Sequence, residues 1–224
     1  MGWLIGSRVL SARRRRLGRT RRLPIIVATA VVMAAGCATP VPQRPFTELD
    51  AAERRDMLRD IAEFRMEGRL ALKTGRRGYS GTVSWDQNED VVDFRFRGPF
   101  GFGGFRIHGD AERLRVKTTG GDEFLLTDPE REMTDRFGWS LPVYSMRYWI
   151  LGVSDPEVPA DEAMDDEGLL NKLEQAGWRV RYDSYDESHG LMLPRRMEME
   201  HGDVRIKVMA DRWDIPGSAL LAGR

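Results

Sequence analysis

The sequence predicts a mainly β fold with a few helices, in which a long antiparallel sheet curls into an open or closed barrel. Three observations predict it. Between residues 64 and 127, and again from residue 177 to 213, apolar and polar residues alternate with a period of two, as in strands with one wet face. Short turns join successive runs, so neighbouring strands are antiparallel. Each strand has one wet face and the helical segments are too few to cover the other face, and such a sheet tends to curl on itself.

The first 36 residues do not belong to this fold. They hold eight arginines and no acidic residue, and they lead to an apolar stretch from Leu23 to Ala35. This stretch is shorter than the ~20 residues of a membrane-spanning helix and ends in small residues. The pattern predicts a signal peptide over residues 1–36, with a transmembrane anchor as the alternative.

Cys37, the only cysteine of the chain, directly follows Ala34, Ala35 and Gly36. Small residues before a cysteine at the end of a signal resemble the lipobox of bacterial lipoproteins, where the thiol is acylated and the chain is cut before it. Lipoboxes favour leucine where Ala34 stands, and a free core or surface thiol is the alternative. We expect Cys37 to be the lipid anchor, and the proline-rich residues 37–47 to be a lipidated tether.

The charge of the remaining chain limits its partners. Residues 37–224 carry 27 Lys and Arg against 35 Asp and Glu, a net charge of −8, which argues against nucleic acid as a partner. One cysteine allows no intramolecular disulfide, so the core must stabilise the fold. The length suits one domain, which we place at residues 48–214, with residues 215–224 as a C-terminal tail.

The domain begins with a predicted helix from about residue 48 to 61, where Thr47 and Asp50 are placed to cap a run of good helix formers. The alternating runs that follow predict strands at residues 64–72, 79–85, 92–96, 104–110, 113–119 and 123–127.

Two short helices interrupt the strands. For the first, Asp128 serves as a cap, Pro129 as the first helical residue and Gly138 as the residue after the end. Pro142 and Gly152 have the same roles in the second helix.

The acidic, proline-containing residues 153–168 are predicted to form a solvated surface loop. Strands then resume at residues 177–185, 194–200 and 204–213, and the last two pair across the turn at residues 201–203.

The inward-facing residues of these strands are aromatic and aliphatic. From the alternation alone they form either an ordinary filled core or a site for an apolar ligand. They are Trp85, Phe94, Phe96, Phe105, Ile107, Leu114, Val116, Trp178 and Trp213.

No motif of catalysis stands out. His108, His189 and His201 fall on a predicted strand, in a loop and at a hairpin turn, without a nucleophile motif nearby. The sequence also has no zinc-protease motif and no phosphate-binding loop. We therefore expect that the protein is not an enzyme and uses no cofactor and no metal.

The segment RGPFGFGGF, residues 97–105, places Phe100 at the tip of a predicted hairpin. A phenylalanine there forfeits roughly 1.5–3 kcal/mol of burial, which favours a ring that contacts something outside this chain. A ring folded back onto a neighbouring strand is the alternative. Proline at the second position and Phe100 at the third predict a type I turn, with glycine at the fourth.

A set of motifs resembles, in order and spacing, the LolB family of outer-membrane lipoproteins. The resemblance covers about residues 60–214, and its most specific motif is a helix that carries RxWILG after a proline. The lipobox-like AAGC agrees with it independently, since family members are lipoproteins. The motifs are YSGTVSWDQ, FRGPFG, TDPEREMTDRFGWSLPVYSMRYWILG, GWRVRYDSYD, LPRRMEME and VRIKVMADRW.

The resemblance implies a half-open, LolA/LolB-like antiparallel β-barrel that encloses an apolar cavity, with helices across its mouth. It implies a receptor that accepts triacylated lipoproteins from the periplasmic carrier LolA and inserts them into the outer membrane. The protein would be a lipid-anchored monomer in the inner leaflet, facing the periplasm. Its partners would be a LolA-type carrier, acylated cargo and membrane lipid.

The resemblance also implies the site residues. Phe100 matches an exposed apolar residue, often leucine, that engages the membrane in family members, with Pro99 beside it and Phe102 as a helper. Arg147 binds either a structural carboxylate or the polar part of the cargo. Two other functions stay open, a generic periplasmic binder of hydrophobic ligands and a structural lipoprotein with a filled core. The residues expected to line the cavity are Trp85, Phe94, Phe96, Leu114, Val116, Met146, Trp149 and Ile150.

Overall fold

A computed structural model describes residues 49–101, 103–110, 112–137 and 142–217, all of which lie in one compact unit that spans residues 43–224. Within these ranges, eleven antiparallel strands form one sheet in the order β6-β5-β4-β3-β2-β1-β11-β10-β9-β8-β7. The edge strands β6 and β7 do not pair with each other, so the sheet is open. The predicted mainly β, antiparallel fold is confirmed. The predicted signal peptide, Cys37 and the tether lie outside the described residues.

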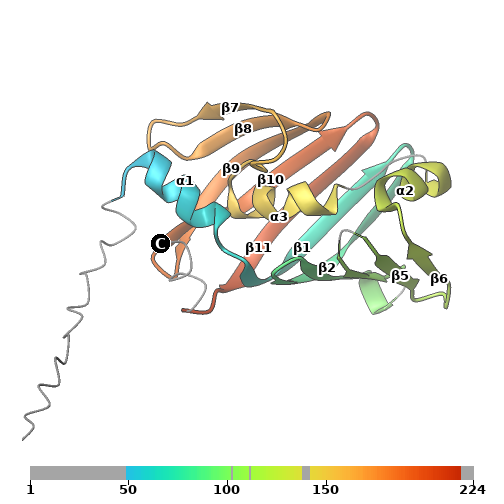
Figure 1. Cartoon of the computed structure of the whole chain (residues 1–224). Helices are drawn as coiled ribbons and strands as arrows, with labels where there is room; N and C mark the ends of the chain where they lie inside the picture. The colour runs from blue at the N-terminus through green and yellow to red at the C-terminus, as the bar shows by residue number, and fades with distance from the viewer. Residues whose placement is uncertain (1–48, 102, 111, 138–141, 218–224) are drawn as a thin grey trace, which may run out of the picture. The chain divides into compact units, whose positions relative to one another are not determined.

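Two meanders meet in this sheet (Figure 1). The first consists of β1 (Glu63–Thr74), β2 (Arg77–Asn88), β3 (Val91–Arg97), β4 (Phe105–Gly109), β5 (Leu114–Thr118) and β6 (Glu123–Leu126). The second consists of β7 (Ala160–Met164), β8 (Leu170–Gln175), β9 (Trp178–Ser188), β10 (Leu191–His201) and β11 (Val204–Asp214). Pairing of β1 with β11 joins them.

The sheet has one apolar and one polar face. In β1, for example, Phe64, Met66 and Leu70 are buried, while Arg65 and Arg69 point to the opposite side, where they meet carboxylates. We call these the inner face and the outer face. The helices α1 (Ala51–Arg59), α2 (Pro129–Phe137) and α3 (Val143–Leu151) lie along the inner face (Figure 1). No helix in the described ranges is long and apolar enough to cross a membrane.

The helix α1 is shorter than predicted because Asp50 is its N-cap. The Asp50 carboxylate accepts hydrogen bonds from the backbone N–H groups of Ala52 (2.8 Å) and Glu53 (2.9 Å). In return, the Glu53 carboxylate accepts from the Asp50 N–H (3.1 Å), which completes a capping box. Thr47 lies outside the described residues.

The start of α2 and the end of α3 are as predicted, whereas Gly138, expected after the end of α2, lies outside the described residues. Pro129 is the first residue of α2, and the Asp128 carboxylate accepts from the Arg131 N–H at 3.4 Å. Gly152 ends α3 with a left-handed φ of 84°. Pro142, however, is the N-cap of α3 and not its first helical residue, a shift of one position that is common at helix ends.

The prediction of a loop over residues 153–168 was wrong in its second half, which contains β7, and β8 was not predicted at all. No alternation marks β7, since four of its five residues are exposed and only Met164 is half-buried. In β8, Leu170 and Leu173 are buried three positions apart, a spacing typical of helices. Pairing of β8 with β9, and of β7 with β8, makes these residues strands, and that pairing leaves no local signal.

The amide of Gln175 at the end of β8 anchors α3 in the interior. Its Oε1 accepts from the indole N–H of Trp149 (2.7 Å) and from the Asp155 backbone N–H (3.0 Å). Its Nε2 donates to the carbonyls of Asp155 (2.9 Å) and Val158 (2.7 Å). The Asp155 carboxylate also accepts from the Ser145 hydroxyl at 2.7 Å. One buried amide therefore ties the helix, the segment after it and the sheet together.

Replacing this amide tests its role. We expect Gln175→Leu to lower the free energy of unfolding by about 2–4 kcal/mol, because each of two buried donors left without an acceptor costs about 1–3 kcal/mol. Glu174→Leu is the control, since Glu174 is the exposed neighbour on the same strand, and it should change stability by less than about 0.5 kcal/mol. Urea unfolding followed by tryptophan fluorescence measures both. Equal stability of the two variants would show that the Gln175 amide does not anchor α3.

Candidate functional site

All eight residues expected to line a cavity lie on the inner face or on the side of α3 that faces it. Each is at most 7% exposed, and all belong to one continuous apolar cluster. The sheet supplies Trp85, Phe94, Phe96, Leu114 and Val116, and α3 supplies Met146, Trp149 and Ile150. Sheet and helix thus enclose one apolar interior between them.

Aromatic rings form a continuous strip across β1 to β4 on this face. The ring of Trp85 meets Phe64 at 6.2 Å and Phe94 at 5.6 Å between centroids, the second pair edge to face. Phe105 follows at 5.9 Å from Phe94 and 5.5 Å from Phe96. Such contacts add roughly 0.5–1.5 kcal/mol each beyond the area they bury.

The interior is also rich in methionine. An unbranched thioether side chain adopts many shapes at little cost and fills irregular gaps, whereas a β-branched side chain is held in one rotamer. An interior with many methionines can therefore repack around an inserted apolar chain. The buried methionines of the cluster are Met66, Met133, Met146, Met197 and Met199.

Arg147 lies on α3 but does not enter the interior. Its guanidinium donates to the Asp90 carboxylate (3.3 Å) and to the Glu89 carbonyl (3.2 Å) in the turn between β2 and β3, and it lies 4.8 Å from the centre of the Tyr148 ring. Of the two roles considered for this residue, the contacts match the structural carboxylate. Arg147 holds the middle of α3 to the edge of the inner face.

The loop after β3 presents Phe100 to solvent, with 98% of its surface exposed. The Gly101 N–H donates to the Gly98 carbonyl at 3.2 Å, which closes a turn as predicted. The φ of Phe100 is +57°, however, so the turn is not type I, whose third residue lies near −90°. A left-handed phenylalanine costs about 1–2 kcal/mol. Pro99 is exposed beside it, and Phe102 lies outside the described residues.

This loop approaches β2 closely at Gly81. A Cβ atom at this position would overlap the carbonyl oxygen of Arg97, and it would lie 2.7 Å from the Arg97 carbonyl carbon and 3.0 Å from the Gly98 Cα. Backbone atoms cannot move aside as a flexible side chain can. The Phe100 turn can therefore lie this close to β2 only because residue 81 is a glycine, which has no side chain.

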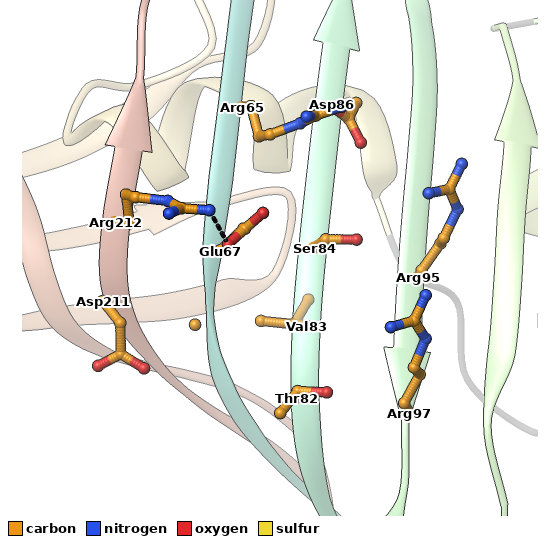
Figure 2. Close-up of a pocket in the computed structure, with 11 residues that line it drawn as sticks. Arg65, Glu67, Thr82, Val83, Ser84, Asp86, Arg95, Arg97, Asp211 and Arg212 are labelled. Atoms are coloured by element: carbon orange, nitrogen blue, oxygen red, sulfur yellow. Dashed lines mark hydrogen bonds and ion pairs between the residues drawn. The ribbon is translucent and has the colours of Figure 1, made fainter. Parts of the chain in front are cut away.

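The outer face carries a hollow of about 550 Å³ that crosses β11, β1, β2 and β3 (Figure 2). Its charged side chains are largely paired. Arg212 donates to Glu67 at 2.6 Å, and Arg65 donates to Asp86. A second hollow of about 680 Å³ shares Thr82 with the first and extends to the Phe100 turn.

Asp93 shows how the charges of this face are balanced. It accepts hydrogen bonds from Arg95 (2.6 Å) and Arg106 (2.7 Å). Burial raises the pKa of the Asp93 carboxyl, but the hydrogen bond from Arg106 and the two positive charges outweigh burial, so its pKa lies below the usual value. The carboxylate stays ionised at neutral pH.

A family model described as "Outer membrane lipoprotein LolB" matches residues 62–213, which is more than half of the chain. The chain belongs to the LolB family. The match runs from the residue before β1 to the last residues of β11. It therefore includes the complete sheet, α2, α3 and the Phe100 turn.

Curated LolB relatives are similar over most of their length. The outer-membrane lipoprotein LolB of Nitrosococcus oceani is 29% identical over 193 residues, which cover 85% of this chain and 96% of the relative. That of Pseudomonas aeruginosa is 26% identical over 192 residues, 84% of this chain and 94% of the relative.

A solved structure shares the fold at low identity. A DUF1329 family protein from Desulfovibrio piger has a TM-score of 0.51 at 7% identity and covers 75% of this chain and 91% of its own. A LolA superfamily protein from Nitrosomonas europaea has a TM-score of 0.48 at 11% identity and covers 77% of this chain and 97% of its own.

Two residues that position the site were not predicted. Gly81 interrupts an alternating strand, and a glycine within a strand often marks a close backbone approach, so a signal was present. No sequence signal marks Gln175, because a glutamine between a glutamate and an alanine does not differ locally from a surface residue. Its burial depends on hydrogen bonds to α3 and to the segment after it, at Trp149, Asp155 and Val158.

A methyl group at position 81 tests the close approach. We expect Gly81→Ala to lower stability by about 1–3 kcal/mol, since backbone must shift to admit the Cβ, and to displace the Phe100 turn. Gly78→Ala on the same strand is the control, because no atom lies within 4 Å of a Cβ there. Thermal unfolding and the amide NMR shifts of residues 98–101 report both effects. If the resonances of residues 98–101 do not shift in Gly81→Ala, the position of the Phe100 turn does not depend on Gly81.

Proposed function

We propose that this LolB-family protein is an outer-membrane receptor that takes acylated lipoproteins from a LolA-type periplasmic carrier and inserts them into that membrane. The observation that carries the proposal is the family match over residues 62–213, which includes every strand of the sheet. In this proposal Cys37 is the lipid anchor in the inner leaflet, and the domain faces the periplasm as a monomer.

The inner face is the proposed site for the acyl chains of the cargo. Each acyl CH₂ left in water costs ~0.8 kcal/mol, so three chains cost on the order of tens of kcal/mol and need shielding during transfer. The apolar cluster between the sheet and α3 offers this shielding. Since its side chains are packed against one another, acyl chains enter by displacing them, and the methionines make that displacement cheap.

Transfer of the cargo requires no nucleotide at this step. The acyl chains move from a weaker apolar site in the carrier to a stronger one in the receptor, and from there to the bilayer. Each step is downhill because each offers the chains more apolar contact. The receptor thus needs a packed interior that opens and a means of sensing the membrane.

Phe100 is the proposed contact with the membrane. Its ring is exposed and its backbone is strained, two unfavourable features that the fold itself does not need. Residues held in such conformations cluster at functional sites. An aromatic ring on a protruding turn inserts into the lipid interface, where delivery of the cargo takes place.

A pull-down tests acceptance of cargo. A soluble form, residues 38–224, which contains the whole compact unit, is mixed with a carrier loaded with a triacylated lipoprotein. We expect the cargo to be found on the receptor. Cargo that stays wholly on the carrier would contradict the proposal and favour a structural lipoprotein with a filled core. Retention of a small lipid without exchange of acylated protein would favour a generic binder.

Two substitutions of Phe100 test delivery. Phe100→Glu removes the apolar ring, and Phe100→Asn removes it while suiting the left-handed backbone better than phenylalanine does. We expect both variants to accept cargo nearly as the wild type does, but to lose at least about tenfold in transfer of cargo to vesicles, measured by flotation.

Leu125→Glu is the matched control, because Leu125 is another exposed apolar residue, 54% exposed on the edge strand β6. It should deliver cargo normally. An equal loss of acceptance and delivery in the Phe100 variants would refute the assignment of this residue to the membrane step.

A further inference from the structure

Three arginines form a row across the outer face. Following the strand register, Arg97 on β3 pairs with Thr82 on β2, and Thr82 pairs with Arg69 on β1. Arg69 pairs with Met209 on β11, which pairs with Arg196 on β10. We call Arg97, Arg69 and Arg196 the arginine row. Because strands lie ~4.8 Å apart, its members follow one another at ~10 Å between Cα atoms.

The two outer members of the row have no ion-pair partner among the described residues. Arg69 donates two hydrogen bonds to Asp211, at 2.8 and 3.1 Å, and the hydrogen bond from Arg69 lowers the pKa of the Asp211 carboxyl. Arg97 and Arg196 are exposed, and within the described part of the chain neither has a carboxylate within ion-pair distance. An unpaired guanidinium keeps its donors for an external anion.

The row borders the 680 Å³ hollow that also reaches Pro99 and Phe100. Figure 2 shows one end of this border, with Arg97 on β3 beside Thr82 on β2. The apolar side chains of Ala71 and Met209 line the same hollow. Exposed cations and an exposed aromatic ring therefore occur at one place on the surface.

The carboxylates of the hollow do not neutralise the row. Glu198 has a side chain only 7% exposed and is paired with Arg181 (2.5 Å), Arg205 (3.1 Å) and Lys207 (3.5 Å). Asp183 pairs with Arg181 at 2.8 Å. Four Lys and Arg side chains line the hollow against these two acidic ones, although residues 37–224 carry a net charge of −8.

We propose that the arginine row binds the phosphate groups of anionic phospholipids and lays the outer-face hollow against the membrane surface, with Phe100 in the lipid interface. This inference rests on the proposed function and names the lipid chemistry that the membrane step recognises. Guanidinium groups bind phosphate through paired N–H donors. A cationic patch beside an inserted apolar residue is the usual composition of a surface that binds anionic bilayers.

The row explains how an acidic protein orients on an anionic surface. Long-range repulsion between the net negative protein and such a surface opposes contact through any other acidic region. At the hollow the local charge has the opposite sign and short-range attraction acts within a Debye length. The row thus selects the orientation in which Phe100 faces lipid.

Vesicle sedimentation with the cargo-free soluble form tests the row. The vesicles consist of phosphatidylcholine alone, or of phosphatidylcholine with phosphatidylglycerol. We expect Arg97→Gln and Arg196→Gln each to weaken binding to the phosphatidylglycerol vesicles about fivefold, and the double variant about 25-fold. Binding to pure phosphatidylcholine should not change, and added salt should weaken wild-type binding more than that of the double variant.

Arg113→Gln is the matched control. Arg113 is exposed in the turn after β4, at the end of that strand away from the Phe100 turn, and it has no carboxylate within ion-pair distance among the described residues. Its variant should bind both kinds of vesicle as the wild type does. Thermal unfolding of all variants checks that folding is unchanged.

Two results would overturn the inference. One is wild-type affinity of the double variant for phosphatidylglycerol vesicles. The other is an equal loss in Arg113→Gln, which would mean that net charge alone acts. If the double variant binds vesicles normally but captures less cargo from the carrier, the row is a protein-binding surface and the inference fails. Cargo that stays on the carrier in the vesicle-free pull-down would instead refute the proposed function, so the two failures are distinguishable.

Discussion

The pairing of β1 with β11 is the interaction on which the rest of the structure depends. It joins a strand near the start of the domain to the last strand, with partners such as Leu70 and Val208 nearly 140 residues apart. The ladder tolerates a register shift between Glu67 and Gly68, where a side chain at Gly68 would overlap the Met209 carbonyl. Without this ladder the two meanders would share neither an inner face nor an arginine row.

The inner face combines tight packing with a capacity to change. Aromatic rings in mutual contact and a single buried amide, that of Gln175, hold the sheet and α3 in one arrangement. The methionines of the same cluster lower the cost of repacking. In the proposed function, acyl chains displace such methionines, three of which (Met66, Met197 and Met199) lie on the sheet, while the Gln175 anchor keeps α3 in position.

The outer face carries the features that the interior does not need. Ion pairs such as Glu67 with Arg212 neutralise much of it, and exposed pairs of this kind add little stability. Phe100 and the two unpaired members of the arginine row are departures from that balance. Their location around one hollow is the basis of the proposal that they contact a membrane, and the close approach at Gly81 positions the Phe100 turn within it.

Local patterns in the sequence predict the antiparallel class, the inward residues of most strands, the start of α2, the end of α3 and the exposed turn at Phe100. Alternation, helix caps and turn residues are local properties, so they can be read without knowing the partners of a strand. The folded chain adds what these patterns do not contain: β7 and β8 are strands, Gln175 is buried, Phe100 is left-handed, and Arg97, Arg69 and Arg196 lie in one row. β7 and β8 depend on pairing with the next strand, and Gln175 depends on hydrogen bonds to α3 and the segment after it. The arginine row depends on the register between strands far apart in the sequence, and close backbone contact at Gly81 positions the Phe100 turn. None of these contacts leaves a periodic pattern in the chain.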